Sequence, residues 1–119
     1  MTTPLPSYTH GVWDAPMLGD TIGDNFDRTV AAHADRDALV DRPSGRRWTY
    51  AELKRDVDAV AAGLLKRGIA KGDRVGIWAP NCPEWTLIQY ATAKIGAILV
   101  NINPAYRAHE LKYVLDQAG

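Results

Sequence analysis

The fold of this chain is decided by the sequence DRVGIWAPNCPEW at residues 73–85 and by GAILVN at residues 96–101. The run Val75–Ala79 is apolar without polar alternation, which is typical of a strand covered on both faces in a parallel sheet. Pro80 ends this run because proline has no N–H to donate to a sheet. Pro83 suits the first turn of a helix, where its missing N–H costs nothing.

A helix is predicted between the two apolar runs. Its inward residues recur at three- to four-residue spacing, and Gly96 can end it in the left-handed conformation. The chain is therefore predicted to be α/β, with two parallel strands joined by a crossover helix. The inward residues are Trp85, Ile88, Ala91, Thr92 and Ile95.

The residues upstream predict a helix and a hairpin. Ile22, Phe26 and Val30 recur every four residues and indicate a helix over residues 21–34, capped by Thr21 or Asp20. The turn sequence RPSG follows, so residues 38–41 and 46–49 should pair as a short antiparallel hairpin.

A second helix is marked by the capping box TYAE at residues 49–52, in which the threonine hydroxyl and the glutamate carboxylate each accept a free backbone N–H. Gly68 should end this helix. Its buried stripe should contain Leu53, Val57, Val60, Ala61, Leu64 and Leu65, and its water-facing side Lys54, Arg55, Asp56 and Asp58.

The two ends of the chain have less pattern. Residues 1–20 predict an irregular arm that Trp13 and Met17 could anchor, and residues 21–119 form the incomplete α/β domain. A last helix is expected over residues 107–117, although its start lacks a good capping residue. Its inward residues should be Leu111, Val114, Leu115 and Ala118.

The composition excludes several classes of protein. The 119 residues carry 14 basic and 14 acidic side chains, so a nucleic-acid-binding surface and a polybasic membrane anchor are not expected. Cys82 is the only cysteine, which favours a reducing compartment. No secretory signal and no run long enough to span a bilayer is found, so we expect a cytoplasmic protein.

No known catalytic motif is present. The glycines around Asp73 lie before or within the strand, whereas the glycines of a dinucleotide-binding loop follow the strand. No P-loop and no nucleophile elbow occurs either. His10, His33 and His109 have no cysteine or carboxylate at metal-ligand spacing, so surface positions are expected.

Three residues after the first apolar strand are candidates for a site, because ligands dock at the carboxyl ends of strands in open α/β sheets. Asn81 could bind a ligand, but we expect it to cap the helix that follows. Cys82 could be a reactive thiolate beside a helix start, although an inert role is favoured. Glu84 should complement the helix dipole.

Five further residues could contact a ligand, and each has a structural alternative. The aromatic rings could stack on a planar ligand but are more often packing residues. The two asparagines near the end of the second strand could bind a ligand, but turn chemistry is favoured. These residues are Trp78, Trp85, Tyr90, Asn101 and Asn103.

Three segments resemble the adenylate-forming (AMP-binding) superfamily of acyl-CoA synthetases. They are WTYAEL at residues 48–53, KGDRVGI at residues 71–77 with Asn81 and Glu84 after it, and KIGA at residues 94–97 with Asn103–Pro104 and ELKYVL downstream. The resemblance covers roughly residues 20–119. The segments SYTHG and TIGDNF, at residues 7–11 and 21–26, are similar to the medium-chain fatty-acyl branch.

The resemblance implies an enzyme that uses ATP and Mg²⁺ to convert a fatty acid to an acyl-adenylate and then transfers the acyl group to coenzyme A. In such families the phosphate loop, the ribose-binding aspartate and the catalytic lysine lie further along the chain. The resemblance therefore implies an N-terminal fragment, inactive alone. We assign it no catalytic, cofactor-binding or metal residue, and expect its partner to be the rest of the polypeptide.

Two other functions stay open. The chain could be a free-standing binding or interaction module that uses the sheet end near Asn81 and the arm. It could also belong to a member of the same superfamily that adenylates another carboxylic acid, such as an aryl or amino acid.

We predict that the 119-residue chain alone is marginally stable or self-associates through a strand edge, because two parallel strands normally need neighbours on both sides. Size-exclusion chromatography with light scattering and a thermal melt will measure this. A cooperative monomer with a sharp melt would contradict the prediction.

Overall fold

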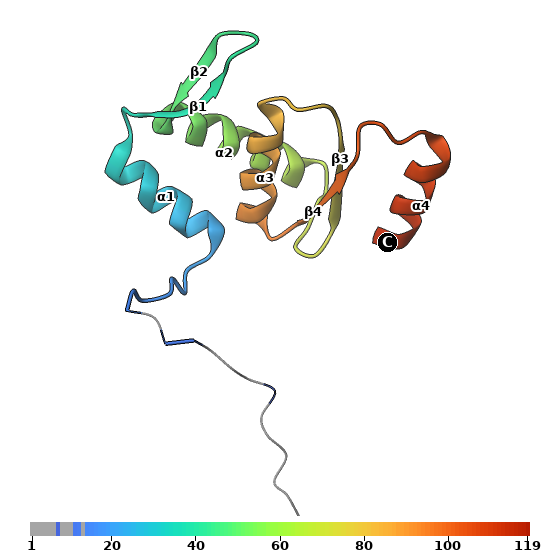
Figure 1. The fold of residues 1–119 in the computed structure, drawn as a ribbon, viewed down its shortest axis with the longest axis horizontal. Coiled ribbons are helices and arrows are strands. Elements are labelled where there is room, and N and C mark those ends of the chain that lie inside the picture. Colours follow the sequence, from blue (N-terminus) through green and yellow to red (C-terminus); the bar gives the residue numbers. More distant parts are fainter. Residues whose placement is uncertain (1–6, 8–10, 13) are drawn as a thin grey trace, which may run out of the picture.

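The computed structural model describes Ser7, residues 11–12 and residues 14–119, which form four helices and four strands (Figure 1). The element order confirms the predicted α/β class. In chain order the elements are α1 (Ile22–His33), β1 (Asp37–Asp41), β2 (Arg46–Thr49), α2 (Tyr50–Lys66), β3 (Arg74–Trp78), α3 (Glu84–Ile95), β4 (Ile98–Ile102) and α4 (Ala108–Ala118).

The strands form two small sheets. β1 and β2 pair antiparallel as the predicted hairpin, which projects from the helices in Figure 1. β3 and β4 pair in parallel with α3 between them, from Arg74 opposite Ile98 to Trp78 opposite Ile102. The predicted strand–helix–strand unit is therefore confirmed. Gly96 ends α3 with a φ of 75°, the left-handed conformation expected of it.

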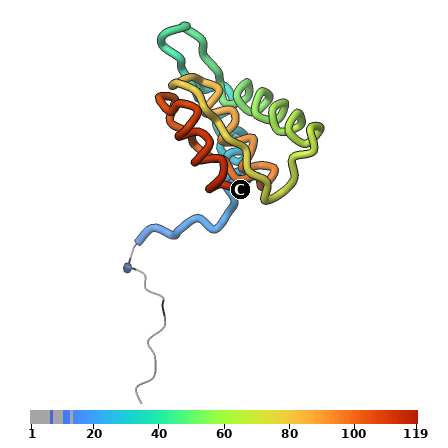
Figure 2. The backbone as a smooth tube through the Cα atoms, turned by 90° about the vertical axis from the view of Figure 1, so that its right-hand side faces the viewer, coloured from blue at the N-terminus to red at the C-terminus, as the bar shows by residue number. Residues whose placement is uncertain are grey.

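The hydrophobic core lies between the helices and not around the parallel sheet. α1, α2 and α3 pack together and the hairpin covers one side of them. The buried cluster consists of Phe26, Val30, Trp48, Leu53, Val57, Ala61 and Ala91. Figure 2 shows the same grouping from the side.

The expectation that β3 is covered on both faces is wrong within the described residues. Its side chains alternate between half-buried and exposed, and Trp78 keeps 48% of its surface exposed. Ile98 at the start of β4 is 49% exposed. A sheet of two strands has too little width to be covered on both faces by the elements present.

The first helix differs from its expected face at one end. Thr21 caps α1 through its hydroxyl, which accepts the N–H of Asp24 at 3.1 Å, and Phe26 and Val30 are buried as predicted. Ile22 is 62% exposed, so the prediction that it lines the same face as Phe26 and Val30 is wrong. Gly23 is buried instead. It packs against Lys94, and a Cβ there would lie 3.2 Å from Cγ of Lys94.

The second helix begins with the predicted capping box. The Glu52 N–H donates to the Thr49 hydroxyl at 3.2 Å, and the Thr49 N–H donates to the Glu52 carboxylate at 2.9 Å. Leu65 is 54% exposed and does not belong to the buried stripe. Asp56 does not simply face water, since it accepts the indole N–H of Trp48 at 2.9 Å.

The last helix is only loosely attached. Its start is capped better than predicted, because the Glu110 carboxylate accepts the Arg107 N–H at 3.1 Å. None of its residues is buried; Leu115 is 51% and Tyr113 65% exposed, so the inward position predicted for Leu115 is wrong. α4 lies at the opposite end of the molecule from α1 (Figure 1).

The arm before α1 is described only in part. Met17 is 87% exposed, so it does not anchor the arm, and Trp13 lies outside the described residues, as does much of residues 1–10. The division into an arm of residues 1–20 and a domain of residues 21–119 stays a prediction. None of the described helices combines the length and the apolar character needed to cross a bilayer.

Replacing Gly96 with valine should lower the free energy of unfolding by about 1–2 kcal/mol, because an L side chain is strained at positive φ. A Cβ there would also lie 3.0 Å from Cγ of Lys71. Gly63→Ala is the control: Gly63 is exposed in α2, and a Cβ there would meet no other part of the molecule within 4 Å, so alanine should stabilise by roughly 0.5–1 kcal/mol. Equal melting temperatures for Gly96→Val and the parent chain would refute the assigned conformation.

Candidate functional site

The carboxyl ends of β3 and β4 meet at one edge of the parallel sheet, where the sequence placed its candidates. The indole N–H of Trp78 donates to the backbone carbonyl of Asn103 at 3.1 Å and so joins the two strand ends. The Asn103 side chain accepts the Ala105 N–H at 2.9 Å, which is the predicted turn chemistry. Asn101 lies inside β4 opposite Ile77 and not in the turn.

Asn81 does not cap α3, so that prediction is wrong. Pro83 occupies the capping position and no side chain bonds there. The free N–H groups of the first turn donate to backbone carbonyls: Trp85 to Cys82 at 3.2 Å, and Thr86 to Pro83 at 3.0 Å. Asn81 precedes the capping position by two residues and is exposed. It is free to contact another group.

A hollow of about 350 Å³ lies between the hairpin and the start of α3. It brings Asn81 and Cys82 together with Asp41 and Arg42 of the hairpin. Its lining contains no histidine or lysine that could act as a general base for the half-buried Cys82 thiol. The hollow can therefore hold polar groups, and Asp41 is the one carboxylate in its lining.

Glu84 links α3 to the hairpin. Its carboxylate lies 3.6 Å from the Arg46 guanidinium, which stacks 4.4 Å above the Trp48 ring. Hydrogen bonding to its own backbone N–H, then to the Cys82 side chain, then the charge of Arg46 hold the pKa of Glu84 below its ordinary value. Glu84 is therefore ionised at neutral pH, which suits the predicted dipole role and not that of a general acid.

The other aromatic candidates make contacts within the fold. The Trp85 indole N–H donates to the carbonyls of Ala79 and Pro80 at 3.2 and 3.1 Å. The Tyr90 ring stacks on Phe26 with a centroid distance of 4.5 Å. Both contacts are those of packing residues.

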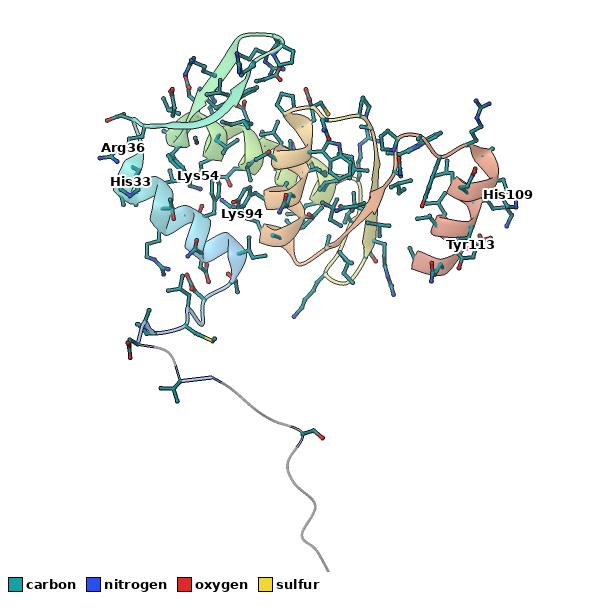
Figure 3. The ribbon with its side chains drawn as sticks, viewed as in Figure 1. His33, Arg36, Lys54, Lys94, His109 and Tyr113 are labelled. Atoms are coloured by element: carbon teal, nitrogen blue, oxygen red, sulfur yellow. The ribbon has the colours of Figure 1, made fainter. Side chains whose placement is uncertain are left out.

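The histidines are not gathered at a site in the part of the chain that the structure describes. His33 and His109 are exposed on α1 and α4, at opposite ends of Figure 3, and His10 lies outside the described residues. Among residues 14–119, no group of three or more His, Cys, Asp or Glu side chains could hold a metal ion.

Four charged residues, of which Lys54 and Asp58 were predicted to face water, form a closed ring between three helices. Lys94 of α3 donates to Asp27 of α1 at 2.7 Å and to Asp58 of α2 at 2.5 Å. Lys54 of α2 donates to Asp58 at 2.6 Å and lies 3.2 Å from Asp27. Figure 3 shows Lys54 and Lys94 between α1, α2 and α3. We call these four residues the ion ring.

The ion ring is partly shielded from water. Lys94 is 13% exposed and its ammonium also lies 5.4 Å from the Phe26 ring, whereas the two aspartates are about half exposed. The hydrogen bond from Lys94 lowers the pKa of Asp27. Burial acts to raise the pKa of Asp58, but the hydrogen bonds from Lys54 and Lys94 outweigh it and lower that pKa. The hydrogen bond from Asp58 raises the pKa of Lys54.

Replacing Lys94 with methionine keeps the buried stem and removes the charge, so the free energy of unfolding at pH 7 should fall by about 1–3 kcal/mol. Solvent screening of the half-exposed aspartates keeps the loss below that of a fully buried pair. Denaturant unfolding will measure it. Lys112→Met is the control, because the exposed Lys112–Asp116 pair within α4 should contribute less than about 0.5 kcal/mol.

The same variants should differ in their pH dependence. Because the folded-state pKa of both ring aspartates is lowered from 3.8, their stabilisation is present above that value and is lost as the pH falls through the folded-state pKa. The deficit of Lys94→Met should therefore be largest near neutral pH and shrink below about pH 4. A deficit independent of pH would mean that Lys94 acts by packing alone.

Comparison with known proteins places these residues in a family. The profile of the AMP-binding enzyme family matches residues 26–119. The mouse protein "Medium-chain acyl-CoA ligase ACSF2, mitochondrial" is 47% identical over 122 aligned positions, which cover 99% of this chain and 20% of that protein. "Putative acyl-CoA synthetase YngI" of Bacillus subtilis (strain 168) is 47% identical over 104 positions, 87% of this chain and 19% of the relative.

The fold is also shared with solved structures. The Klebsiella oxytoca "NpsA N-terminal subdomain in complex with anthranilyl-AMSN" superposes with a TM-score of 0.78 at 34% identity, over 83% of this chain and 25% of that chain. The chain spans about a fifth of the length of the curated relatives it matches and corresponds to the N-terminal part of acyl-CoA ligases. The sequence and the fold agree: this chain belongs to the AMP-binding enzyme family.

Proposed function

We propose that this chain is the N-terminal segment of an ATP-dependent fatty-acid–CoA ligase and is inactive alone. The observation that carries the proposal is the 47% identity to a medium-chain acyl-CoA ligase over 99% of the chain. Identity of that extent includes the hairpin, α3 and β4 together, and not a single motif.

The proposed reaction has two displacements. A carboxylate oxygen of the fatty acid attacks the α-phosphorus of ATP and pyrophosphate leaves, which gives an acyl-adenylate. The thiol sulfur of coenzyme A then attacks the acyl carbonyl carbon and loses its proton, and AMP leaves. Splitting the transfer in this way replaces one difficult step by two easier ones.

The residues described here fit a supporting role in that enzyme. Free N–H groups at a helix start can attract a phosphate. At the start of α3, these N–H groups donate to backbone carbonyls, and the ionised Glu84 lies in the same turn. Residues 14–119 also contain no cluster of metal-binding side chains for Mg²⁺. We therefore derive no step through ATP, Mg²⁺ or coenzyme A from the residues of this chain. Its proposed role is to support the sheet and the hairpin.

The proposal extends to partners and location. The partners are the rest of the polypeptide and a fatty acid, with no role for nucleic acid. The cytoplasmic location stays a prediction; the mouse relative is named as a mitochondrial protein.

A second candidate is an enzyme that adenylates an aryl acid. It is favoured by the solved NpsA subdomain, which is in complex with anthranilyl-AMSN and is 34% identical to this chain. The higher identity to fatty-acyl ligases ranks this candidate second. No comparison favours the free-standing interaction module.

ATP–pyrophosphate exchange will test the proposal on the longer polypeptide encoded by the same reading frame, with medium-chain fatty acids, aryl acids and amino acids as substrates. We expect exchange with the fatty acids and none with the 119-residue chain. Exchange with aryl acids only would support the second candidate. A stop codon directly after Gly119, or tight ATP binding by the short chain, would contradict the proposed supporting role.

A further inference from the structure

The tip of the hairpin concentrates positive charge. Residues 42–47, RPSGRR, hold three arginines and no acidic side chain, whereas the whole chain has no net charge. All six residues are exposed, on a hairpin that projects from the helices (Figure 1). Ser44 lies two residues after Arg42 and two residues before Arg46. The turn therefore presents a serine hydroxyl to solvent within a cluster of cations.

The Ser44 hydroxyl makes contacts only within the turn. It donates to the Asp41 carboxylate, and its oxygen accepts the backbone N–H of Arg46 at 3.3 Å. The turn lies beyond the last β1–β2 pair, Asp41 with Arg46, and is closed by the Gly45 N–H, which donates to the Asp41 carbonyl at 2.8 Å. Exposed loop tips open locally at a small cost in free energy. A modifying enzyme can therefore reach Ser44 without disturbing the buried cluster.

Arg46 connects this tip to α3. Its guanidinium lies 3.6 Å from the Glu84 carboxylate and 4.4 Å from the centre of the Trp48 ring. The side chains of Arg46 and Glu84 are 55% and 58% exposed, so their ion pair is weak. A phosphate group carries more charge than a carboxylate, and arginine binds it through two parallel hydrogen bonds. A phosphate in the turn would therefore compete with Glu84 for Arg46.

We propose that Ser44 is a phosphorylation site, and that the hairpin arginines hold the phosphate while Arg46 leaves Glu84. In the modification, Oγ of Ser44 attacks the γ-phosphorus of ATP bound to a protein kinase, the hydroxyl proton passes to a base of the kinase, and ADP leaves. The ester oxygen has no proton to donate to Asp41, and that carboxylate repels the phosphate. The phosphate then turns toward the arginines and the Arg46 N–H. This inference is independent of the proposed acyl-CoA chemistry.

Thr49 is the other hydroxyl close to these arginines in the sequence, but the structure disfavours it. Its hydroxyl accepts the Glu52 N–H at 3.2 Å in the capping box, and its neighbour Trp48 is only 5% exposed. A kinase binds the residues around the acceptor in an extended conformation. At Thr49 this would require α2 to unwind and Trp48 to leave the core, whereas at Ser44 only the turn must open.

The first test is modification of the 119-residue chain, folded by circular dichroism, with ATP and protein kinase C, which selects serines that have basic residues on both sides. Mass spectrometry should locate the phosphate on Ser44, and Arg42→Gln should slow its incorporation about tenfold. Ser7 is the internal control: it is the other serine, is exposed, has no lysine or arginine within three positions, and should stay unmodified. Absence of phosphate on Ser44, or faster modification of Thr49, would overturn the assignment.

The second test measures the phosphate contact on a chain with phosphoserine inserted at position 44 during translation. Arginines favour the dianion, so the midpoint of the ³¹P NMR titration should lie about 0.5–1 pH unit lower in the folded chain than in the same chain unfolded in urea. Arg46→Gln should remove much of this difference. Arg67→Gln, at an exposed position at the end of α2, should leave it unchanged. The charged groups around the tip are Asp37, Asp41, Arg42, Arg46 and Arg47 of the hairpin and Glu84 of α3.

The release of Glu84 has its own measurement. Its own backbone N–H, Cys82 and Arg46 lower the pKa of Glu84, so loss of Arg46 should raise that pKa in the phosphorylated chain, as followed by carboxyl NMR. The same rise in a phosphorylated Arg46→Gln chain would show that Arg46 is not the cause. Equal phosphate midpoints in the folded and unfolded chains would overturn the proposed contact. Both tests are independent of pyrophosphate exchange, so the phosphorylation site and the reaction can fail separately.

Discussion

Contact between three helices through one shared ion ring is the interaction on which the described structure most depends. α1 packs on α2 and α3, and Lys94 reaches from α3 to an aspartate on each of the other two. Lys54 closes the ring, so two cations and two carboxylates neutralise one another in a half-buried place. The stem of Lys94 also covers Gly23, which allows α1 to approach closely. The ion pairs and the packing of Lys94 therefore stabilise the same contact between the three helices.

The packing of the three helices around the ion ring gives the molecule a closed side, formed by the helices and the hairpin, and an open side, formed by the parallel sheet. The helices and the hairpin bury Trp48, Leu53 and Val57 and satisfy their own polar groups. The parallel sheet, in contrast, leaves Trp78 and Ile98 about half exposed and one edge of β3 unpaired. The chain spans about a fifth of the length of its relatives, and its described residues bury the helical side and leave the side of the parallel sheet partly exposed.

Much of the fold could be predicted from local patterns because those patterns act over a few residues. The capping box at Thr49, the hairpin turn and the left-handed Gly96 each depend on neighbours in sequence, and each is where it was expected. The ion ring could not be predicted, since Asp27 and Lys94 are 67 residues apart and each resembles an ordinary surface charge. The failed prediction for Asn81 has a similar cause: helix starts can be satisfied by backbone carbonyls, which leave no mark in the sequence.

The different surroundings of two tryptophans give each side of the molecule its own optical signal. Trp48 is 5% exposed in the helical core beneath the Arg46 guanidinium, and Trp78 is 48% exposed at the end of the parallel sheet. An indole shielded from water emits at shorter wavelength and resists collisional quenchers. A hydrated indole emits at longer wavelength and is quenched more readily. Once Trp13 and Trp85 are replaced with phenylalanine, emission from these two rings can therefore show whether the core and the sheet lose their structure in one transition or in two.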